Sequence, residues 1–125
     1  MSDIKCVVTT VSTMLSDDFC AEQFKSLIEA QWLEVDHRRK TGSLNVDFSK
    51  YLKMEELNVH FIVVAYRGTE IVGYNSMFVS PSPHTGELTA MTDTIYIKPT
   101  YRKEGLGSIM IDMAEQEARS RGCEH

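Results

Sequence analysis

Apolar and polar residues along this chain follow first a strand-like and then a helix-like pattern. Residues 4–10 form a short run rich in β-branched side chains, which is typical of a strand. After a capping serine and two aspartates, apolar side chains recur at spacings of three and four, which predicts an amphipathic helix ending near residue 37. Residues 38–46 lack any period and are expected to form a loop. A second, short helix is expected next, capped by Asn45 or Asp47.

The period then changes to that of strands. Residues 61–66 are almost continuously apolar, which indicates a strand covered on both faces. Residues 67–70 predict a tight reversal with a glycine available for a positive φ, and residues 71–79 are expected to return as the antiparallel partner. Gly73 within this partner predicts a bulge or a close approach of another backbone. Residues 80–86 are expected to form a surface loop.

A further strand is expected from about residue 87 to residue 97, before a last helix. Regular alternation along this strand would place every second side chain on the same face. One face would then carry Thr89, Met91, Asp93, Ile95 and Ile97, and the other Leu88, Ala90, Thr92, Thr94 and Tyr96. The last helix is expected from about Gly105 to Arg121, with Gly122 as its terminator. The resulting order, β-α-α-β-β-β-α, indicates an α+β fold.

Composition and charge narrow the classes of protein that fit. Length and apolar content favour a single domain over residues 1–125. The net charge of −5 argues against nucleic acid and anionic membrane surfaces as partners, because both bind through basic fields. The one locally basic run, residues 37–40, is typical of a solvated loop, and less often of an entrance for an acidic ligand. No apolar run approaches the roughly 20 residues of a membrane span, and residues 1–5 do not begin a signal peptide.

The cysteines and histidines are too scattered to suggest a metal site or a disulfide framework. The three cysteines fit neither a paired framework nor a CxxC motif, and the four histidines have no zinc-ligand spacing. We therefore expect no metal, a reducing environment and a cytoplasmic location.

The stretch RKEGLGS, residues 102–108, joins the last strand to the last helix. Glycines at such a junction allow a ligand to approach unpaired backbone N–H groups at the positive end of the helix dipole, an arrangement that suits phosphate. The alternative is that they only allow a tight turn. A G-x-x-x-x-G-K-[ST] loop does not occur, because Ser108 and Ile109 follow the second glycine. A dinucleotide fingerprint fails as well, since Met110 stands where a third glycine or alanine is needed.

Residues 95–107, IYIKPTYRKEGLG, resemble the central motif of the GNAT superfamily of N-acetyltransferases, [RQ]-x-x-G-x-[GA] after a strand ending in proline. The helix that ends in Arg-Gly-Cys and the order of the upstream elements are similar as well. The resemblance implies a GNAT-like mixed, mainly antiparallel central sheet with helices on both faces. It also implies acetyl-CoA as the cosubstrate and transfer of its acetyl group to a primary amine.

The same resemblance implies which residues would hold acetyl-CoA. The strand backbone at Ile95 and Ile97 would pair with the pantetheine arm, and a nearby backbone amide would polarise the thioester carbonyl. Arg102 occupies the first motif position. The pyrophosphate would be held by the main-chain amides of Lys103, Glu104, Gly105, Leu106, Gly107 and Ser108.

Acetylation of an amine requires an acceptor for its proton, because a free lysine has a pKa of about 10.4. Some members of the family place a glutamate on the corresponding strand. That position is occupied approximately by Met91 here, and Asp93 lies two residues further on. Asp93 is therefore the candidate base, and Glu87 is a more distant one. The alternative for Asp93 is a hydrogen-bonded or solvated carboxylate without a catalytic role.

The resemblance also raises an expectation about the end of the chain. Family members continue into a fifth strand, a further helix and a closing hairpin, so this fold is expected to be C-terminally shortened. The fourth strand would then expose an edge, which a second copy of the chain or a partner chain would cover. A catalytically inactive GNAT-like structural or protein-binding module is therefore the alternative to the enzyme. The acceptor could be a protein lysine, an N-terminus, a polyamine or an aminoglycoside.

Overall fold

The computed structural model describes residues 4–35, 47–81 and 84–123. The loop expected at residues 38–46 and the basic run at residues 37–40 lie outside these ranges. The elements are β1 (Ile4–Thr9), α1 (Val11–Leu15), α2 (Asp18–Val35), α3 (Phe48–Glu56), β2 (His60–Arg67), β3 (Glu70–Pro81), β4 (Leu88–Ile97), the 3₁₀ helix η1 (Pro99–Glu104) and α4 (Leu106–Ser120). The predicted strands and longer helices are present within a few residues, whereas α1 and η1 have no clear period and were not predicted.

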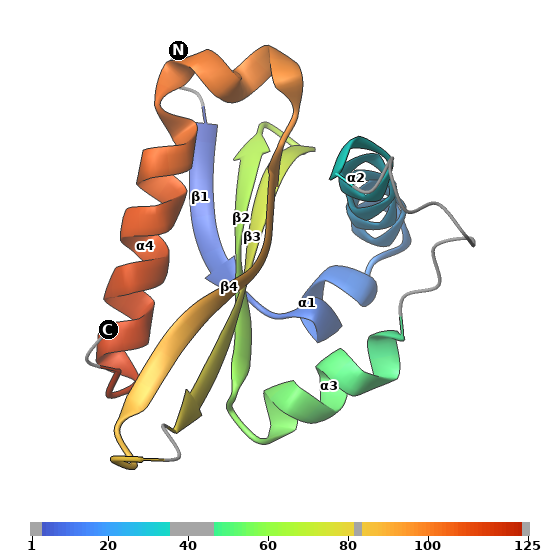
Figure 1. Cartoon of the computed structure of the whole chain (residues 1–125). Coiled ribbons are helices and arrows are strands. Elements are labelled where there is room, and N and C mark those ends of the chain that lie inside the picture. The colour runs from blue at the N-terminus through green and yellow to red at the C-terminus, as the bar shows by residue number, and fades with distance from the viewer. Residues whose placement is uncertain (1–3, 36–46, 82–83, 124–125) are drawn as a thin grey trace.

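The four strands form one sheet in the order β1-β2-β3-β4, and every pairing between them is antiparallel. Helix α4 covers one face of the sheet, and α1, α2 and α3 lie on the other face (Figure 1). The expected α+β fold with helices on both faces is therefore confirmed.

The strand β2 lies in the middle of the hydrophobic core. Phe61, Val63 and Ala65 pack into the cluster beneath α4, while Ile62 and Val64 pack into the cluster beneath α1 and α2. All five side chains are fully buried. Burial of each larger side chain contributes about 1.5–3 kcal/mol relative to exposure. The continuous apolar run is thus explained by helices on both sides, as predicted.

A bulge and a close backbone approach occur together near Gly73. Ala65 pairs with Gly73 and Tyr66 pairs with Ile71, so Val72 is an extra residue on β3. A Cβ atom added to Gly73 would lie only 2.9 Å from the main-chain oxygen of Tyr96 on β4. Any larger residue would have to push β3 and β4 apart, so both features predicted for this glycine are confirmed.

A second bulge, at Asp93, overturns the predicted faces of β4. Ser76 pairs with Thr94 and Met77 pairs with Thr92, which leaves Asp93 without an opposite residue. Side chains before and after the bulge therefore follow different parities. Leu88, Ala90 and Ile97 pack on the α4 side, whereas Tyr96 packs on the side of α1 and α2. The prediction that Asp93, Ile95 and Ile97 share one face was wrong, because it assumed unbroken alternation.

The short helix α1 is fixed by polar contacts at its start. Thr10 is its N-cap, and the side chain of Thr10 accepts a hydrogen bond from the Thr13 amide. Glu55 of α3 accepts hydrogen bonds from the amides of Val11 and Ser12. These first amides have no partner within the helix, so a carboxylate from another helix stabilises α1 and ties it to α3.

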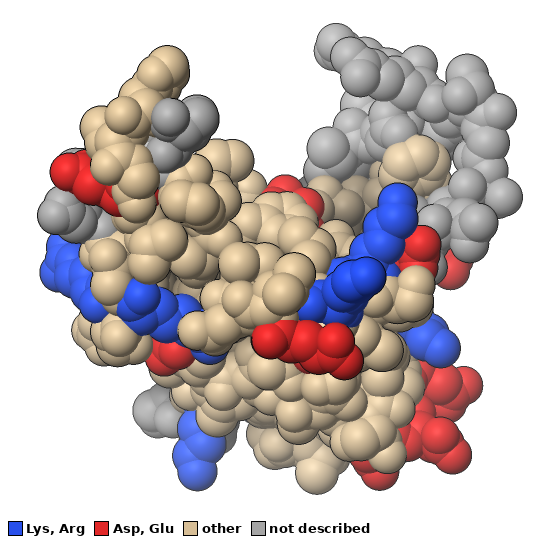
Figure 2. Space-filling view, turned by 90° about the horizontal axis from the view of Figure 1, so that it is seen from below, with Lys and Arg blue, Asp and Glu red and all other residues tan. Residues whose placement is uncertain are grey.

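The surface carries charges of both signs. Seen from below, the molecule shows lysine and arginine side chains interspersed with aspartate and glutamate among many uncharged residues (Figure 2). Among the described residues, no helix has the length and apolar character needed to cross a membrane.

Candidate active site

The glycine turn, residues 102–108, joins η1 to α4 in the way a phosphate site requires. Gly105 has a φ of 75°, ends η1 and begins α4, and a Cβ atom there would meet nothing within 4 Å. The first bond of α4 in the i to i−4 pattern links the Ile109 amide to the Gly105 carbonyl, 3.3 Å away. The amides of Leu106, Gly107 and Ser108 precede that bond. No acidic residue lies in the first turn of α4, so its positive end is not neutralised there.

The two glycines of the turn differ in what the fold demands of them. Gly105 is explained by its left-handed conformation, which side chains other than glycine rarely adopt. Gly107 has no positive φ, and an added Cβ would lie 3.5 Å from Cδ1 of Ile97, an ordinary contact. The fold therefore does not require glycine at position 107. The need for a tight turn explains Gly105 but does not explain Gly107.

Arg102 lies in η1 and folds back onto the end of β4. Its Nε donates a hydrogen bond to the Ile97 carbonyl at 2.8 Å, and its guanidinium lies 5.4 Å from the centre of the Tyr96 ring. The side chain is exposed. Arg102 thus holds the turn against the strand and also brings positive charge to the turn.

The backbone of β4 presents alternate residues to its outer edge. The Lys98 amide donates to the Val72 carbonyl of β3 at 2.9 Å, so by the antiparallel pattern Tyr96 and Thr94 also direct their backbone groups toward β3. Ile95 and Ile97 therefore direct theirs toward the opposite edge, where no described strand pairs with β4. Both isoleucines thus present backbone groups at an edge that no described strand pairs with, and their pairing with a pantetheine arm stays a prediction.

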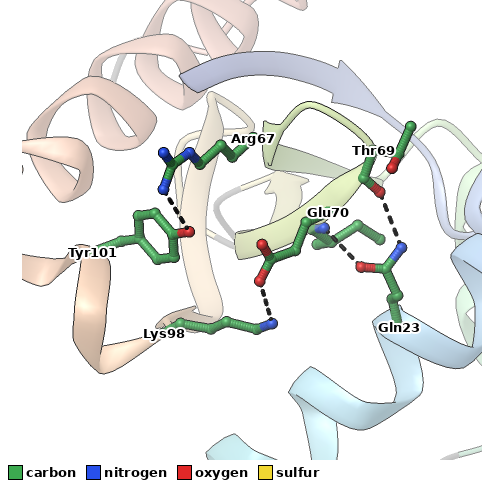
Figure 3. A network of polar contacts seen from close by, with 7 residues as sticks. Gln23, Arg67, Thr69, Glu70, Lys98 and Tyr101 are labelled. Atoms are coloured by element: carbon green, nitrogen blue, oxygen red, sulfur yellow. Dashed lines mark hydrogen bonds and ion pairs between the residues drawn. The ribbon is translucent and has the colours of Figure 1, made fainter. Parts of the chain in front are cut away.

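The β2–β3 hairpin contacts two residues that precede the glycine turn, Lys98 and Tyr101 (Figure 3). Lys98 forms an ion pair with Glu70 at 2.8 Å, and Arg67 donates a hydrogen bond to the Tyr101 hydroxyl at 3.3 Å. The side-chain amide of Gln23 on α2 accepts a hydrogen bond from the Ile71 amide and donates one to the Thr69 carbonyl. Contacts that are distant in sequence therefore fix the position of the glycine turn, and no local motif predicts them.

On the opposite face of the sheet, Asp93 is the centre of a polar network. Its Oδ2 accepts hydrogen bonds from the Tyr51 hydroxyl at 2.8 Å and from Ser76 Oγ at 3.0 Å. Ser76 Oγ also lies 2.7 Å from Nε2 of His60, which is buried. The network joins one residue each from α3, β2, β3 and β4.

The protonation states in this network follow from its geometry. Burial, together with Asp93, raises the pKa of Tyr51, so its hydroxyl remains a donor. Burial lowers the pKa of His60, so its imidazole is neutral near pH 7. Because Ser76 donates its single proton to Asp93, it must accept the proton on His60 Nε2. Nδ1 of His60 then carries a lone pair, and this buried atom has no hydrogen-bond partner among the described residues.

Two cavities flank β4 at the bulge. One, of about 180 Å³, lies between the sheet and α1, α2 and α3, and Asp93 and Thr94 line it. The other, of about 420 Å³, lies on the α4 side, and the preceding residue, Thr92, lines it. Thr92 and Asp93 thus face opposite sides of the sheet, as in a regular strand, whereas the bulge places the consecutive residues Asp93 and Thr94 in the wall of the same cavity.

The structure brings the predicted site residues together only in part. Residues 95–108 follow one another from the end of β4 through η1 to the start of α4, whereas Asp93 faces the side of the sheet covered by α1, α2 and α3. Met91 is exposed, and Glu87 is exposed before β4 begins. Sequence reasoning missed Tyr51, Ser76 and His60, because no spacing links them to Asp93. The described residues contain no group of three or more histidine, cysteine, aspartate or glutamate side chains that could hold a metal.

Comparison with known families agrees with this geometry. The sequence model of the acetyltransferase (GNAT) family matches residues 21–125. The chain belongs to the GNAT family of acetyltransferases. No curated protein sequence matches it.

Solved structures with the same fold include several acetyltransferases. An aminoglycoside acetyltransferase, meta-AAC0020, from an uncultured soil metagenomic sample in complex with sisomicin is 19% identical, with a TM-score of 0.72 over 98% of this chain and 74% of that one. The ribosomal-protein-alanine N-acetyltransferase from Brucella melitensis biovar Abortus 2308 is 16% identical, with a TM-score of 0.71 over 97% and 75%. AAC(6')-Iy with the bisubstrate analog CoA-S-monomethyl-acetylneamine is 11% identical, with a TM-score of 0.72 over 98% and 76%. At these identities the likeness concerns the fold.

Proposed function

We propose that this protein is an acetyl-CoA-dependent N-acetyltransferase that acetylates a primary amine in the cytoplasm. The observation that carries the proposal is the glycine turn. The N-cap residue of α4, Gly105, has no side chain that could cap the first amides of the helix, and no acidic residue lies in the first turn. The fold does not require glycine at position 107. These features leave backbone donors accessible to a phosphate group.

The residues around the turn fit the parts of acetyl-CoA, which would supply an acetyl thioester. Of the predicted residues 103–108, those at the start of α4, residues 106–108, would hold the pyrophosphate through their amides, since residues up to 104 belong to the 3₁₀ helix η1. Arg102 would add positive charge beside it. The outward backbone groups of Ile95 and Ile97 would pair with the amides of the pantetheine arm. The Ile97 carbonyl already accepts from Arg102, so its N–H and the groups of Ile95 are the better placed partners.

Asp93 would act as the proton acceptor for the amine. Both hydrogen bonds described for this carboxylate end on Oδ2, and the side chain lines the 180 Å³ cavity. The donors Tyr51 and Ser76 would hold the carboxylate in one orientation while it receives the proton. Cys6, Cys20 and Cys123 are free thiols, and burial raises the pKa of Cys123, so direct transfer fits better than an acetylated cysteine.

Calorimetry with acetyl-CoA tests the proposal directly. We expect saturable binding of one acetyl-CoA per chain, and release of free CoA thiol when a substrate amine is added. If acetyl-CoA does not bind at millimolar concentration, the enzyme proposal fails and a GNAT-like structural or protein-binding module is the better description.

A further inference from the structure

The 180 Å³ cavity beside Asp93, called here the Asp93 cavity, has walls of known chemistry. It lies between the sheet and the three helices α1, α2 and α3. Its apolar walls are Val11, Phe24, Ile28, Phe48, Tyr51, Ile62 and Tyr74, and its polar lining residues are Gln31, Ser76, Asp93 and Thr94. All of these belong to the described part of the chain. The cavity is thus an apolar space with its one carboxylate at the bulge of β4.

The volume of the Asp93 cavity limits the size of what can enter it. Sites for drug-sized ligands usually measure about 300–1,000 Å³. An apolar cavity of about 150 Å³ in another protein accommodates benzene. A space of 180 Å³ therefore suits a single aromatic ring or a short branched alkyl group, and it is too small for a three-ring sugar or a whole peptide side chain with its neighbours.

The charges around the Asp93 cavity limit how many cationic groups a ligand can carry. Among the residues that line it, Asp93 is the one acidic residue, and none is basic. One ammonium group can therefore be paired. A second one would face aromatic and aliphatic walls, and burial of an unpaired charge is strongly unfavourable. In addition, Nζ of Lys25 lies 5.7 Å from the ring centre of Phe48, which places a positive charge next to one wall.

We propose that the acceptor is a primary amine attached to one compact apolar group, such as an arylalkylamine or a short branched alkylamine. The apolar group occupies the Asp93 cavity and the ammonium group lies at Asp93. This assignment rests on the proposed N-acetyltransferase function. In the reaction, Asp93 takes one proton from the ammonium, the amine nitrogen forms a bond to the acetyl carbon, and the C–S bond breaks. The second nitrogen proton then passes to the departing sulfur, so that CoA leaves as the thiol.

A panel of amines tests the substrate class. The probes are 2-phenylethylamine and isobutylamine on one side, and spermidine and sisomicin on the other, each assayed by release of CoA thiol at a fixed acetyl-CoA concentration. We expect kcat/KM for 2-phenylethylamine to exceed that for the two polycations by about 100-fold, since the polycations bring unpaired charges to apolar walls. Equal or faster turnover of spermidine or sisomicin would overturn the assignment while leaving the enzyme proposal intact.

A pair of substitutions on one helix tests the location. Ile28 and Leu33 both belong to α2, but Ile28 lines the Asp93 cavity, whereas Leu33 is 51% exposed. We expect Ile28→Trp to raise KM for 2-phenylethylamine by about 10-fold or more by filling the cavity, with unchanged affinity for acetyl-CoA. Leu33→Trp should change neither. An unchanged KM in a folded Ile28→Trp variant would contradict the assignment.

Direct binding separates this inference from the proposed function. Ligand-observed NMR without acetyl-CoA compares 2-phenylethylamine with 2-phenylethanol, which has the same apolar group and no cation. We expect the amine to bind more tightly to the wild-type protein, and this preference to disappear in Asp93→Asn. If neither compound binds, the cavity assignment fails whatever calorimetry with acetyl-CoA shows. If the amine binds but acetyl-CoA does not, only the enzyme proposal fails.

Discussion

The two sides of β4 build their proposed binding surfaces from different parts of the chain. On the α4 side, the glycine turn offers backbone amides from one continuous stretch, residues 102–108. On the other side, the Asp93 network uses side chains from four separate elements, and Tyr51 lies 42 positions from Asp93. The glycine turn depends on the conformation of its backbone, whereas the Asp93 network depends on the identity of each side chain in it.

This difference predicts different responses to substitution. At the glycine turn, most side chains can change as long as Gly105 keeps its left-handed φ and the space beside it stays open. In the Asp93 network, removal of one member leaves a half-buried polar group without its partner, which costs about 1–3 kcal/mol. The following variants test this contrast.

Asp93→Asn, in the Asp93 network, should have the largest effect on turnover. Asparagine keeps the size of aspartate but cannot accept the amine proton, so turnover should fall by about 10²–10⁴-fold. Affinity for acetyl-CoA should be unchanged. Steady-state release of CoA thiol and calorimetry measure the two quantities, and Asp112→Asn on the exposed face of α4 is the matched control. Normal turnover in Asp93→Asn, with a loss in Glu87→Gln, would move the base to Glu87.

Gly105→Glu, in the glycine turn, should weaken acetyl-CoA binding. The new side chain would enter the open space at the start of α4 and bring a negative charge to the phosphate position. The loss of two charge-assisted hydrogen bonds would weaken acetyl-CoA binding by about 100-fold or more. Calorimetry measures this change.

The control for that variant is Gly86→Glu. Gly86 has a φ of 74°, close to the 75° of Gly105, and also has nothing within 4 Å of an added Cβ. Both variants therefore carry the same backbone strain, but Gly86 lies in the loop before β4. Equal loss of acetyl-CoA binding in the two variants would show that strain, and not the phosphate site, is responsible.

Tyr51→Phe should have a smaller effect, and it should lower turnover without changing acetyl-CoA binding. It removes one of two donors to Asp93 and leaves the ring in the wall of the cavity, so kcat should fall by about 5- to 10-fold, in line with one hydrogen bond to a charged group. Affinity for acetyl-CoA should not change. Tyr66→Phe is the control, because the Tyr66 hydroxyl contacts the sulfur of Met14 and no carboxylate. A larger loss in Tyr66→Phe would contradict an orienting role for Tyr51.

Replacement of His60 should have the smallest effect, and that effect should be on the stability of the fold and not on ligand binding. Its pKa is lowered by burial, so the folded protein binds fewer protons than the unfolded chain once the pH falls below about 6.5. The stabilisation is therefore present above that pH and is lost as the pH falls toward the lowered pKa, at most by about 1.4 kcal/mol per pH unit.

Urea unfolding at pH 7, 6 and 5 measures this dependence. His60→Gln should flatten the decrease in the free energy of unfolding, whereas His84→Gln, at an exposed position, should keep it. The same slope in both variants would mean that folding does not lower the pKa of His60.

The contrast between the two sides also explains what the sequence could predict. The glycine turn was predicted from two glycines in one short stretch between a strand and a helix, and the strands of the core were predicted from apolar runs. Asp93 was identified as a candidate from its place on β4, but its neighbours Tyr51, Ser76 and His60 come from elements whose packing is decided by the whole fold. No local pattern encodes such contacts.

The face assignment on β4 failed for a related reason. A bulge inserts one residue without a distinct composition, and the residues around Asp93 are ordinary strand formers. In contrast, the bulge near Gly73 was predicted, because a glycine inside a strand is a visible signal. The short helix α1 escaped prediction as well, since its stability depends on the carboxylate of Glu55, 44 positions away.

The extra residue at Asp93 has a consequence for how this strand can change over evolution. Deletion of Asp93 would restore a regular strand and keep the sides of its other residues, because Ser76 already pairs with Thr94 and Met77 with Thr92. Tyr96 would still pack on the side of α1 and α2, and Ile97 on the side of α4. A deletion at the bulge would therefore remove the carboxylate alone, whereas a deletion in a regular part of the strand exchanges the faces of the residues beyond it.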